Sequence, residues 1–130
     1  METLKKLKSA AKNEKWEYVD SMIPQISGNL EYAKWAYDEG IKDPDGNIRD
    51  LAVSIIEKSE IPENEFTRMR DTLCLLMEND KNKYVQFRSA FALVNHGPGK
   101  HKKKVLSKLY EAEKDKDVAE LAKEYLKKCR

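Results

Sequence analysis

A glycine-rich turn followed by lysines is the part of this sequence whose residue types come closest to a binding site. The turn, Gly97-Pro98-Gly99-Lys100, precedes a predicted helix, and backbone N–H groups at a helix start can cradle a phosphate. A phosphate loop, however, reads GxxxxGK followed by Ser or Thr, whereas here His101 follows the lysine and Pro98 has no N–H group. We therefore expect no nucleotide and no other cofactor at this turn.

The lysines of this stretch are harder to explain by local structure. We call them the Lys100 cluster, which consists of Lys100, Lys102, Lys103 and Lys104. They fall in the first turns of a predicted helix, where the helix dipole disfavours each cation by roughly a few tenths of a kcal/mol. Two interpretations stay open: a solvated lysine face, or a surface for an anionic partner such as nucleic acid or an acidic peptide.

Two further basic clusters lie towards the ends of the chain. The first consists of Lys5, Lys6, Lys8, Lys12 and Lys15, and the second of Lys127, Lys128 and Arg130. Cations near a helix C-terminus are favoured by the dipole, so the second cluster has a structural explanation.

Pairs of carboxylates could act as general acid and base or bind calcium. The pairs are Asp43 with Asp45 and Asp115 with Asp117. Each pair lies in a turn just before a predicted helix, where side-chain oxygens cap backbone N–H groups. We therefore interpret both pairs as helix caps.

The histidines and cysteines show no catalytic or metal-binding pattern. His96 and His101 have no patterned Ser or Cys nucleophile beside them and no HExxH spacing. Cys74 and Cys129 fall among apolar helix positions, without a CxxC pair or a His at ligand spacing. We expect buried, reduced thiols, no metal site and no catalytic residue, and hence a protein that is not an enzyme.

Several aromatic residues could in principle stack on nucleic-acid bases. They are Trp16, Trp35, Tyr37, Tyr84 and Phe87. Their helical spacing favours packing in a core instead.

The composition is that of an ordinary globular domain. The 130 residues include 25 Lys and Arg against 23 Asp and Glu, and the net charge of +2 is too small to indicate nucleic acid by itself. The opening METLKKLKSAAK lacks the apolar region of a signal peptide, and no window approaches about 18 apolar residues. We expect a cytoplasmic, monomeric protein that does not enter membranes.

The positioning elements emerge from an internal repeat. Residues 48–56, 85–93 and 118–126 align without gaps, and an Asp-rich turn precedes each segment and supplies capping oxygens. The leading residues Ile48, Val85 and Val118 are 37 and then 33 residues apart. This period is typical of two-helix repeats.

A degenerate copy of the repeat precedes these three. Its matching apolar residues are Trp16, Val19 and Ile23. Asp20 stands where the other copies carry a small residue, and Pro24 is expected to cut the helix short. We therefore interpret residues 1–28 as an N-terminal cap.

Partner helices are predicted between the repeat segments, and about eight helices are expected in all. Pro62 marks one helix start, Gly97 a helix end and Pro98 the next start. The helix after Asn82 is apolar around most of its circumference, which predicts burial between neighbours. The last helix has one narrow apolar row, as a terminal helix should.

The repeated segment resembles the second helix of a HEAT repeat, including the short type named after phycobilisome lyases. The shared pattern is a hydrophobic residue, Arg, two free positions, two small residues, one free position and Ala-Leu, after an Asp-containing turn. Residues 85–93 fit it best; Arg49 fills the arginine position, whereas Gln86 and Ala119 depart from it. The tetratricopeptide pattern of Trp, Gly, Tyr and Pro is absent at repeating positions.

The resemblance implies an all-α fold and a surface. The fold would be an α-solenoid, a right-handed superhelix of stacked antiparallel helix pairs, in which three to four HEAT-like repeats form one domain over residues 1–130. The repeats would span residues 29–60, 61–97 and 98–130. In such families the second helices line a concave surface, so the resemblance implies Arg49, Gln86 and Arg88 as partner contacts.

These observations favour a non-enzymatic scaffold that presents a concave helical surface to a peptide or protein partner. The alternative is nucleic-acid binding through the Lys100 cluster. A third possibility, an enzyme such as a lyase-like member of the repeat family, lacks any catalytic residue that the sequence names.

Overall fold

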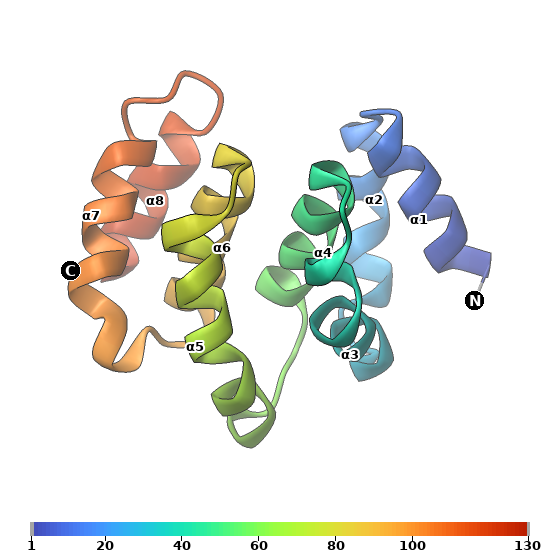
Figure 1. Ribbon diagram of the computed structural model, residues 1–130, viewed down its shortest axis with the longest axis horizontal. Helices are drawn as coiled ribbons and strands as arrows, with labels where there is room; N and C mark the ends of the chain where they lie inside the picture. Colours follow the sequence, from blue (N-terminus) through green and yellow to red (C-terminus); the bar gives the residue numbers. More distant parts are fainter. Residues whose placement is uncertain (1, 130) are drawn as a thin grey trace. The chain divides into compact units, whose positions relative to one another are not determined.

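The computed structural model describes residues 2–129, and every regular element in that range is a helix (Figure 1). Eight α-helices and two short 3-10 helices follow one another along these residues. The predicted all-α class and the predicted number of helices are therefore confirmed. The chain forms two compact units, one ending at Pro62 and one beginning at Glu63, and the prediction of one domain over 1–130 stays a prediction.

The first unit is built around one buried helix. Its elements are α1 (Glu2–Lys12), α2 (Trp16–Ile26), α3 (Leu30–Asp38), the 3-10 helix η1 (Gly40–Lys42) and α4 (Gly46–Lys58). Helices α1, α2 and α3 each contact α4 (Figure 1). Nine of the 13 residues of α4 are buried, because neighbours cover most of its circumference. Helix α4 is the core to which the other helices of this unit attach.

Helix α1 attaches to this core by one apolar row. Leu4, Leu7, Ala10 and Ala11 are buried at helical spacing, while Lys and Glu occupy the rest of the helix. This pattern is that of a surface helix with one face towards the core.

The turn after α1 contains an unusual backbone conformation. Glu14 has φ of 57°, in the left-handed region. The N–H of Lys15 donates to the carbonyl of Ala10 at 2.9 Å, and the N–H of Glu14 donates to the carbonyl of Ala11 at 3.1 Å. These are the paired bonds of a Schellman helix end, a position that Gly usually occupies because it has no Cβ.

Pro24 does not end its helix, so the prediction that it cuts the helix short is wrong. Helix α2 continues through Pro24 to Ile26. Pro24 lacks the N–H that would bond the carbonyl of Asp20, but Asp20 is exposed, so water can satisfy that carbonyl. Val19 and Ile23 are buried, as their spacing predicts, and Trp16 is half-buried.

The 3-10 helix η1 lets the chain pass close to the core. Gly40 is buried, and a Cβ added to it would lie 2.6 Å from the Cβ of Ala52 in α4. The same Cβ would lie 3.0 Å from the ring of Trp35. Only a residue without a side chain therefore fits between α4 and this ring.

The second unit contains two helix pairs. Its elements are α5 (Glu63–Asn79), α6 (Lys83–His96), the 3-10 helix η2 (Gly99–His101), α7 (Lys102–Ala112) and α8 (Ala119–Cys129). Helix α6 contacts α5, α7 and α8, and α7 contacts α8. The rings of Phe91 and Tyr125 stack between α6 and α8, with centroids 4.8 Å apart and an angle of 9° between planes.

The predicted start and stop signals lie within a few residues of the observed helix ends. Pro62 directly precedes α5, and Gly97 follows α6 with φ of 107°. Pro98 precedes η2, so α7 begins at Lys102 rather than at the proline. Seven residues of α6 but only four of α8 are buried, in line with the wide and narrow apolar patterns of their sequences.

Two of the three turns before the repeated helices cap their helices as predicted, and the third holds a matching bond within the turn. The side chain of Asp45 accepts bonds from the N–H groups of Asn47 and Ile48, and that of Asn82 from Tyr84 and Val85. In the third turn, Asp115 accepts from the N–H of Asp117 at 2.9 Å. The capping residue stands three positions before Ile48, Val85 and Val118 respectively.

Replacing Glu14 by Gly should stabilise the protein. Glycine adopts the left-handed conformation without the Cβ clash, which costs other residues about 1 kcal/mol. The free energy of unfolding from urea titration should therefore rise by about 1 kcal/mol in Glu14→Gly. The control is Glu14→Ala, which removes the charge but keeps the Cβ and should change little. An equal gain in both variants would contradict the strain argument.

Replacing Gly40 by Ala should destabilise the protein, because the added methyl group collides with Ala52 and Trp35. Overpacking of this kind costs about 1–3 kcal/mol, measurable as a lower midpoint of thermal unfolding. The matched control is Gly28→Ala, whose added Cβ would lie 3.4 Å from the nearest atom, Glu60 Oε2. If both variants unfold at the same temperature, the close approach at Gly40 does not matter for stability.

Candidate functional site

Two of the predicted partner contacts brace the turns before their own helices. Arg49 Nη1 donates to the carbonyls of Asp43 and Pro44, at 3.0 Å each. Gln86 Nε2 donates to the carbonyl of Asp80 at 2.5 Å. Arg49 and Gln86 directly follow Ile48 and Val85. Residues at the same repeat position therefore donate to backbone carbonyls of the preceding turn in both cases. A role in partner binding stays a prediction for both.

The third predicted contact, Arg88, is half-buried on α6. Gln86, on the same helix, also accepts a bond from Lys108 Nζ of α7 at 2.9 Å. Ala119 holds the equivalent position at the start of α8 and has no polar side chain to brace a turn. Gln86 of α6 is therefore engaged both with the turn before its helix and with α7.

The structure divides the Lys100 cluster into two parts. Lys100 Nζ lies 3.9 Å from Asp71 Oδ1, and Lys104 Nζ lies 3.2 Å from Glu78 Oε1. Both carboxylates belong to α5. Lys102 and Lys103 are exposed, and neither forms an ion pair with another residue in 2–129. Half of the positive charge of this cluster is therefore compensated by α5.

Asp71 and Glu78 are held in their charged forms by these neighbours. His101 Nε2 lies 2.6 Å from Asp71 Oδ1, and this hydrogen bond, followed by the charge of Lys100, lowers the pKa of Asp71. The thiol of Cys74 donates to Glu78 at 3.3 Å, and this bond and Lys104 lower the pKa of Glu78. Burial, followed by the same bond to Glu78, raises the pKa of the Cys74 thiol, so this cysteine is less reactive than an exposed one.

The carboxylates of the last turn are also engaged. Lys83 Nζ lies 2.9 Å from Asp115 Oδ2, and this contact is the largest cause of the lowered pKa of Asp115. The hydroxyl of Tyr84 donates to Asp117 Oδ2 at 2.5 Å, which raises the pKa of Tyr84. Among residues 2–129, no group of three or more His, Cys, Asp or Glu side chains is arranged to hold a metal ion.

The remaining residues singled out by sequence serve packing. Cys74 and Cys129 are buried and unbridged. His96 packs on Phe66 with ring centroids 4.7 Å apart. Phe87 is buried. In the C-terminal cluster, Lys128 Nζ lies 4.9 Å from the ring centroid of Tyr125, and Arg130 lies outside the described residues.

Helix α1 carries the basic surface that is least compensated by acidic residues. We call it the α1 basic face, which consists of Lys5, Lys6, Lys8, Lys12 and Lys15. All except Lys8 are exposed, and none of the five pairs with a carboxylate in the part of the chain that is described. Three surface depressions share α1 as a wall. The α1 basic face is therefore the best candidate for a charged binding surface.

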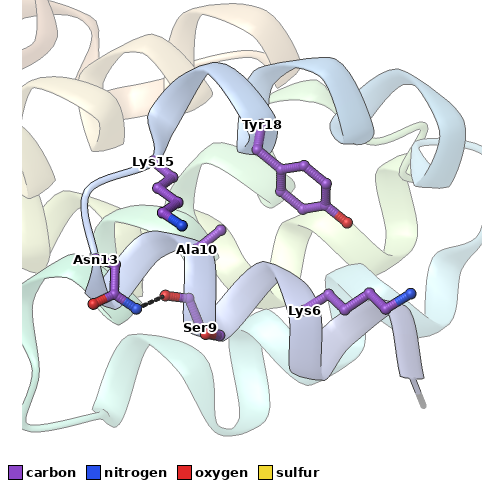
Figure 2. Close-up of a pocket in the computed structure, with 6 residues that line it drawn as sticks. All are labelled: Lys6, Ser9, Ala10, Asn13, Lys15 and Tyr18. Atoms are coloured by element: carbon purple, nitrogen blue, oxygen red, sulfur yellow. Dashed lines mark hydrogen bonds between the residues drawn. The ribbon is translucent and has the colours of Figure 1, made fainter.

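One depression, which we call the α1–α2 hollow, has a volume of about 430 Å³. Figure 2 shows Lys15, which directly precedes α2, and Tyr18 of α2 extending over α1, with Lys6 reaching outwards along α1. Asn13 is turned back and donates to the carbonyl of Ser9 at 2.9 Å. The hollow combines two cations and a phenol, but it has few buried polar groups that could fix a small ligand.

A second depression, which we call the α1–α3 groove, has a volume of about 530 Å³. Lys5 and Lys8 line it from α1. Three carboxylates and one cation line it from α3 and the residue after it: Glu31, Lys34, Asp38 and Glu39. Opposite charges therefore face the same groove from its two sides.

Apolar side chains lie in the α1–α3 groove between these charges. They are Leu4, which is buried, and Trp35, which is half-buried. Lys8 Nζ lies 5.9 Å from the Trp35 ring centroid, within the range of a cation–π interaction. Gly40 leaves room for the same ring.

Comparison with known proteins identifies no relative of this chain: no family model, no curated protein and no solved structure matches it. Over residues 2–129, no helix combines the length and the apolar character that a bilayer span requires.

The sequence indicates part of this site but not the groove. The lysines of the sequence already mark α1 as basic. The charges of Glu31, Asp38 and Glu39 carry no signal of their own, because exposed acidic residues are common on helices. Their importance depends on the nearness of α1 and α3, which follows from the packing of both helices on α4.

The contact between Asp71 and His101 should make stability depend on pH. The pKa of Asp71 is lowered in the folded protein, so its contribution is fully present above the unfolded value of about 3.9 and is lost as pH falls through the folded value. In urea titrations we expect the difference in free energy of unfolding between wild type and Asp71→Asn to be smaller at about pH 2 than at about pH 6. In a His101→Ala background this difference should be smaller and should vary less with pH. A pH-independent difference would exclude this linkage.

Proposed function

We propose that this chain is a non-enzymatic module of HEAT-like repeats, an α-solenoid that binds a protein or peptide partner. The recurring turn carries the proposal. Asp45 and Asn82 cap α4 and α6 from the same repeat position, and Asp115, at the matching position before α8, accepts a bond from the N–H of Asp117 within its turn. The agreement of side-chain roles, and not only of residue types, supports true repeats.

Contacts between equivalent positions in the second unit support stacking in register. Tyr84 directly precedes Val85 as Asp117 directly precedes Val118, and these two side chains share a hydrogen bond. Phe91 and Tyr125 stack between α6 and α8 at nearly matching positions, six residues after Val85 and seven after Val118. Contacts between matching or neighbouring positions are expected where one helix pair lies directly on the next.

The engagement of the titratable groups supports a role other than catalysis. Asp71 and Asp115 have pKa values lowered chiefly by His101 and Lys83, which belong to other elements of the fold. The pKa of Glu78 is lowered first by Cys74 of the same helix and then by Lys104 of α7. Perturbed groups in ion pairs of this kind serve structure, whereas catalytic groups are perturbed within a cleft that admits substrate.

Nucleic-acid binding through the Lys100 cluster is the second candidate. The exposure of Lys102 and Lys103 favours it, since lysines without carboxylate neighbours are available to phosphates. Asp71 and Glu78 weigh against it, because their charges compensate Lys100 and Lys104 and repel a polyanion. The protein-binding proposal is therefore the better supported of the two.

Capture from a nuclease-treated extract of the source cells tests these functions against each other. We expect the immobilised chain to retain a protein partner that quantitative mass spectrometry identifies and that free chain displaces. Replacing Arg88 by Ala should reduce this retention about tenfold, because side chains at the centre of an interface contribute more than about 1 kcal/mol. Folding of the variant is checked by circular dichroism.

The matched control is Lys103→Ala, which should leave retention unchanged. The proposal fails if no displaceable protein is retained. It also fails if retention is seen only in a parallel capture from untreated extract, depends on Lys103 and falls steeply with salt, as phosphate contacts require. That second result would establish nucleic-acid binding instead.

A further inference from the structure

We propose that the α1–α3 groove is a docking site for a peptide segment of mixed charge, with an apolar residue flanked by acidic residues on one side and basic residues on the other. The proposal names the partner chemistry and a site on the first unit, and it rests on the proposed function only in that the partner is a polypeptide. The groove contains none of the candidate contact residues on α6 or α7 that were considered above.

The first argument is that opposite charges line the groove without neutralising each other. No carboxylate of Glu31, Asp38 or Glu39 lies within 4.0 Å of Lys5 or Lys8 in the described structure, whereas Lys34 does lie 4.0 Å from Glu31. Lys and Glu side chains are long enough to pair across a narrow groove. Here Lys5 and Lys8 do not pair with the carboxylates on the opposite side, so both signs of charge are available to a ligand.

The second argument is the apolar surface between the charges. Trp35 is only half-buried, although Gly40 allows its ring to lie close to the core. A large aromatic side chain that remains partly open within a groove is the kind of residue that anchors an interface. An apolar side chain of the ligand would cover the exposed part of this ring and take apolar area away from water.

The charges select a polypeptide over the other macromolecules that bind basic helices. A nucleic acid presents phosphates throughout, so Glu31, Asp38 and Glu39 would repel it within about one Debye length, roughly 8–10 Å. A membrane surface would need an apolar face of α1, but Leu4 and Leu7 are already buried against the first unit. A peptide can carry both signs of charge and an apolar residue in a few positions.

The size of the groove agrees with this ligand. Its volume of about 530 Å³ lies within the range of about 300–1,000 Å³ for ligand pockets in general. Because the surface is shallow and partly exposed, each charge pair should contribute only about 0.2–1 kcal/mol, and specificity should come from the arrangement of charges.

The test uses three synthetic helical peptides and one nucleic acid as probes. The mixed peptide has a central Leu with Glu on one side and Lys on the other; the acidic and basic peptides carry only Glu or only Lys around the same Leu. The nucleic acid is an oligodeoxythymidine. NMR titration of the full-length chain follows the indole N–H of Trp35. We expect the mixed peptide to shift this signal at a concentration about tenfold lower than either single-sign peptide or the oligonucleotide.

A charge reversal sharpens the test. In the double variant Lys5→Glu with Lys8→Glu, both sides of the groove are acidic, so affinity for the mixed peptide should fall about tenfold and the basic peptide should become the best ligand. The matched control is Lys6→Glu with Lys12→Glu, which changes the same helix by the same charge outside the groove. This control should retain the wild-type order.

Three results would overturn the proposal. They are that no peptide moves the Trp35 signal, that the oligonucleotide or the acidic peptide binds best, and that the two double variants behave alike. None of these results affects the capture experiment at Arg88, which addresses the second unit, so failure of the groove and failure of the general protein-binding function are distinguishable.

Discussion

The side-chain cap in the turn before α4 and before α6 is the interaction on which the packing of these helices depends. A helix leaves its first N–H groups without partners, and here one side-chain oxygen three positions before Ile48, Val85 or Val118 accepts from them or from the turn before them. This bond sets where the helix begins, and so sets which apolar residues face the neighbouring helix. Tyr84 and Asp117, which contact each other, are the second residues after Asn82 and Asp115, and in each case the backbone N–H of that second residue donates to the side chain of Asn82 or Asp115.

The sequence predicts this architecture well where local chemistry and helical spacing agree. The helices after Asp45 and Asn82 combine a cap with a strong apolar pattern, and both were predicted nearly to the residue. Pro24 shows the limit, since a proline rule based on lost hydrogen bonds takes no account of a carbonyl that water can reach. The two compact units are likewise not visible in a regular repeat pattern.

Charge clusters are the features that sequence predicts least well, because their effect depends on residues distant in the chain. The sequence around Lys100 and Lys104 shows no carboxylate partner for either lysine. In the structure these two lysines, four residues apart, face Asp71 and Glu78, which are seven residues apart on α5. Both spacings correspond to one face of a helix. The acidic residues of α5 thus divide the Lys100 cluster, whereas the α1 basic face has no carboxylate partner in the described structure.

The attachment of α1 to the first unit by one face explains why its charges remain available. Helix α4 is contacted by α1, α2 and α3 and accordingly keeps few exposed residues. Helix α1 packs by one apolar row and leaves the rest of its circumference to solvent. Terminal helices in repeat proteins need a polar outer face to prevent further stacking. Lysines satisfy that need, but so would a mixture of charges. The α1 basic face instead carries charges of one sign, and it lies opposite the carboxylates beside α3. Solubility alone does not require this arrangement, and this favours the proposed binding role.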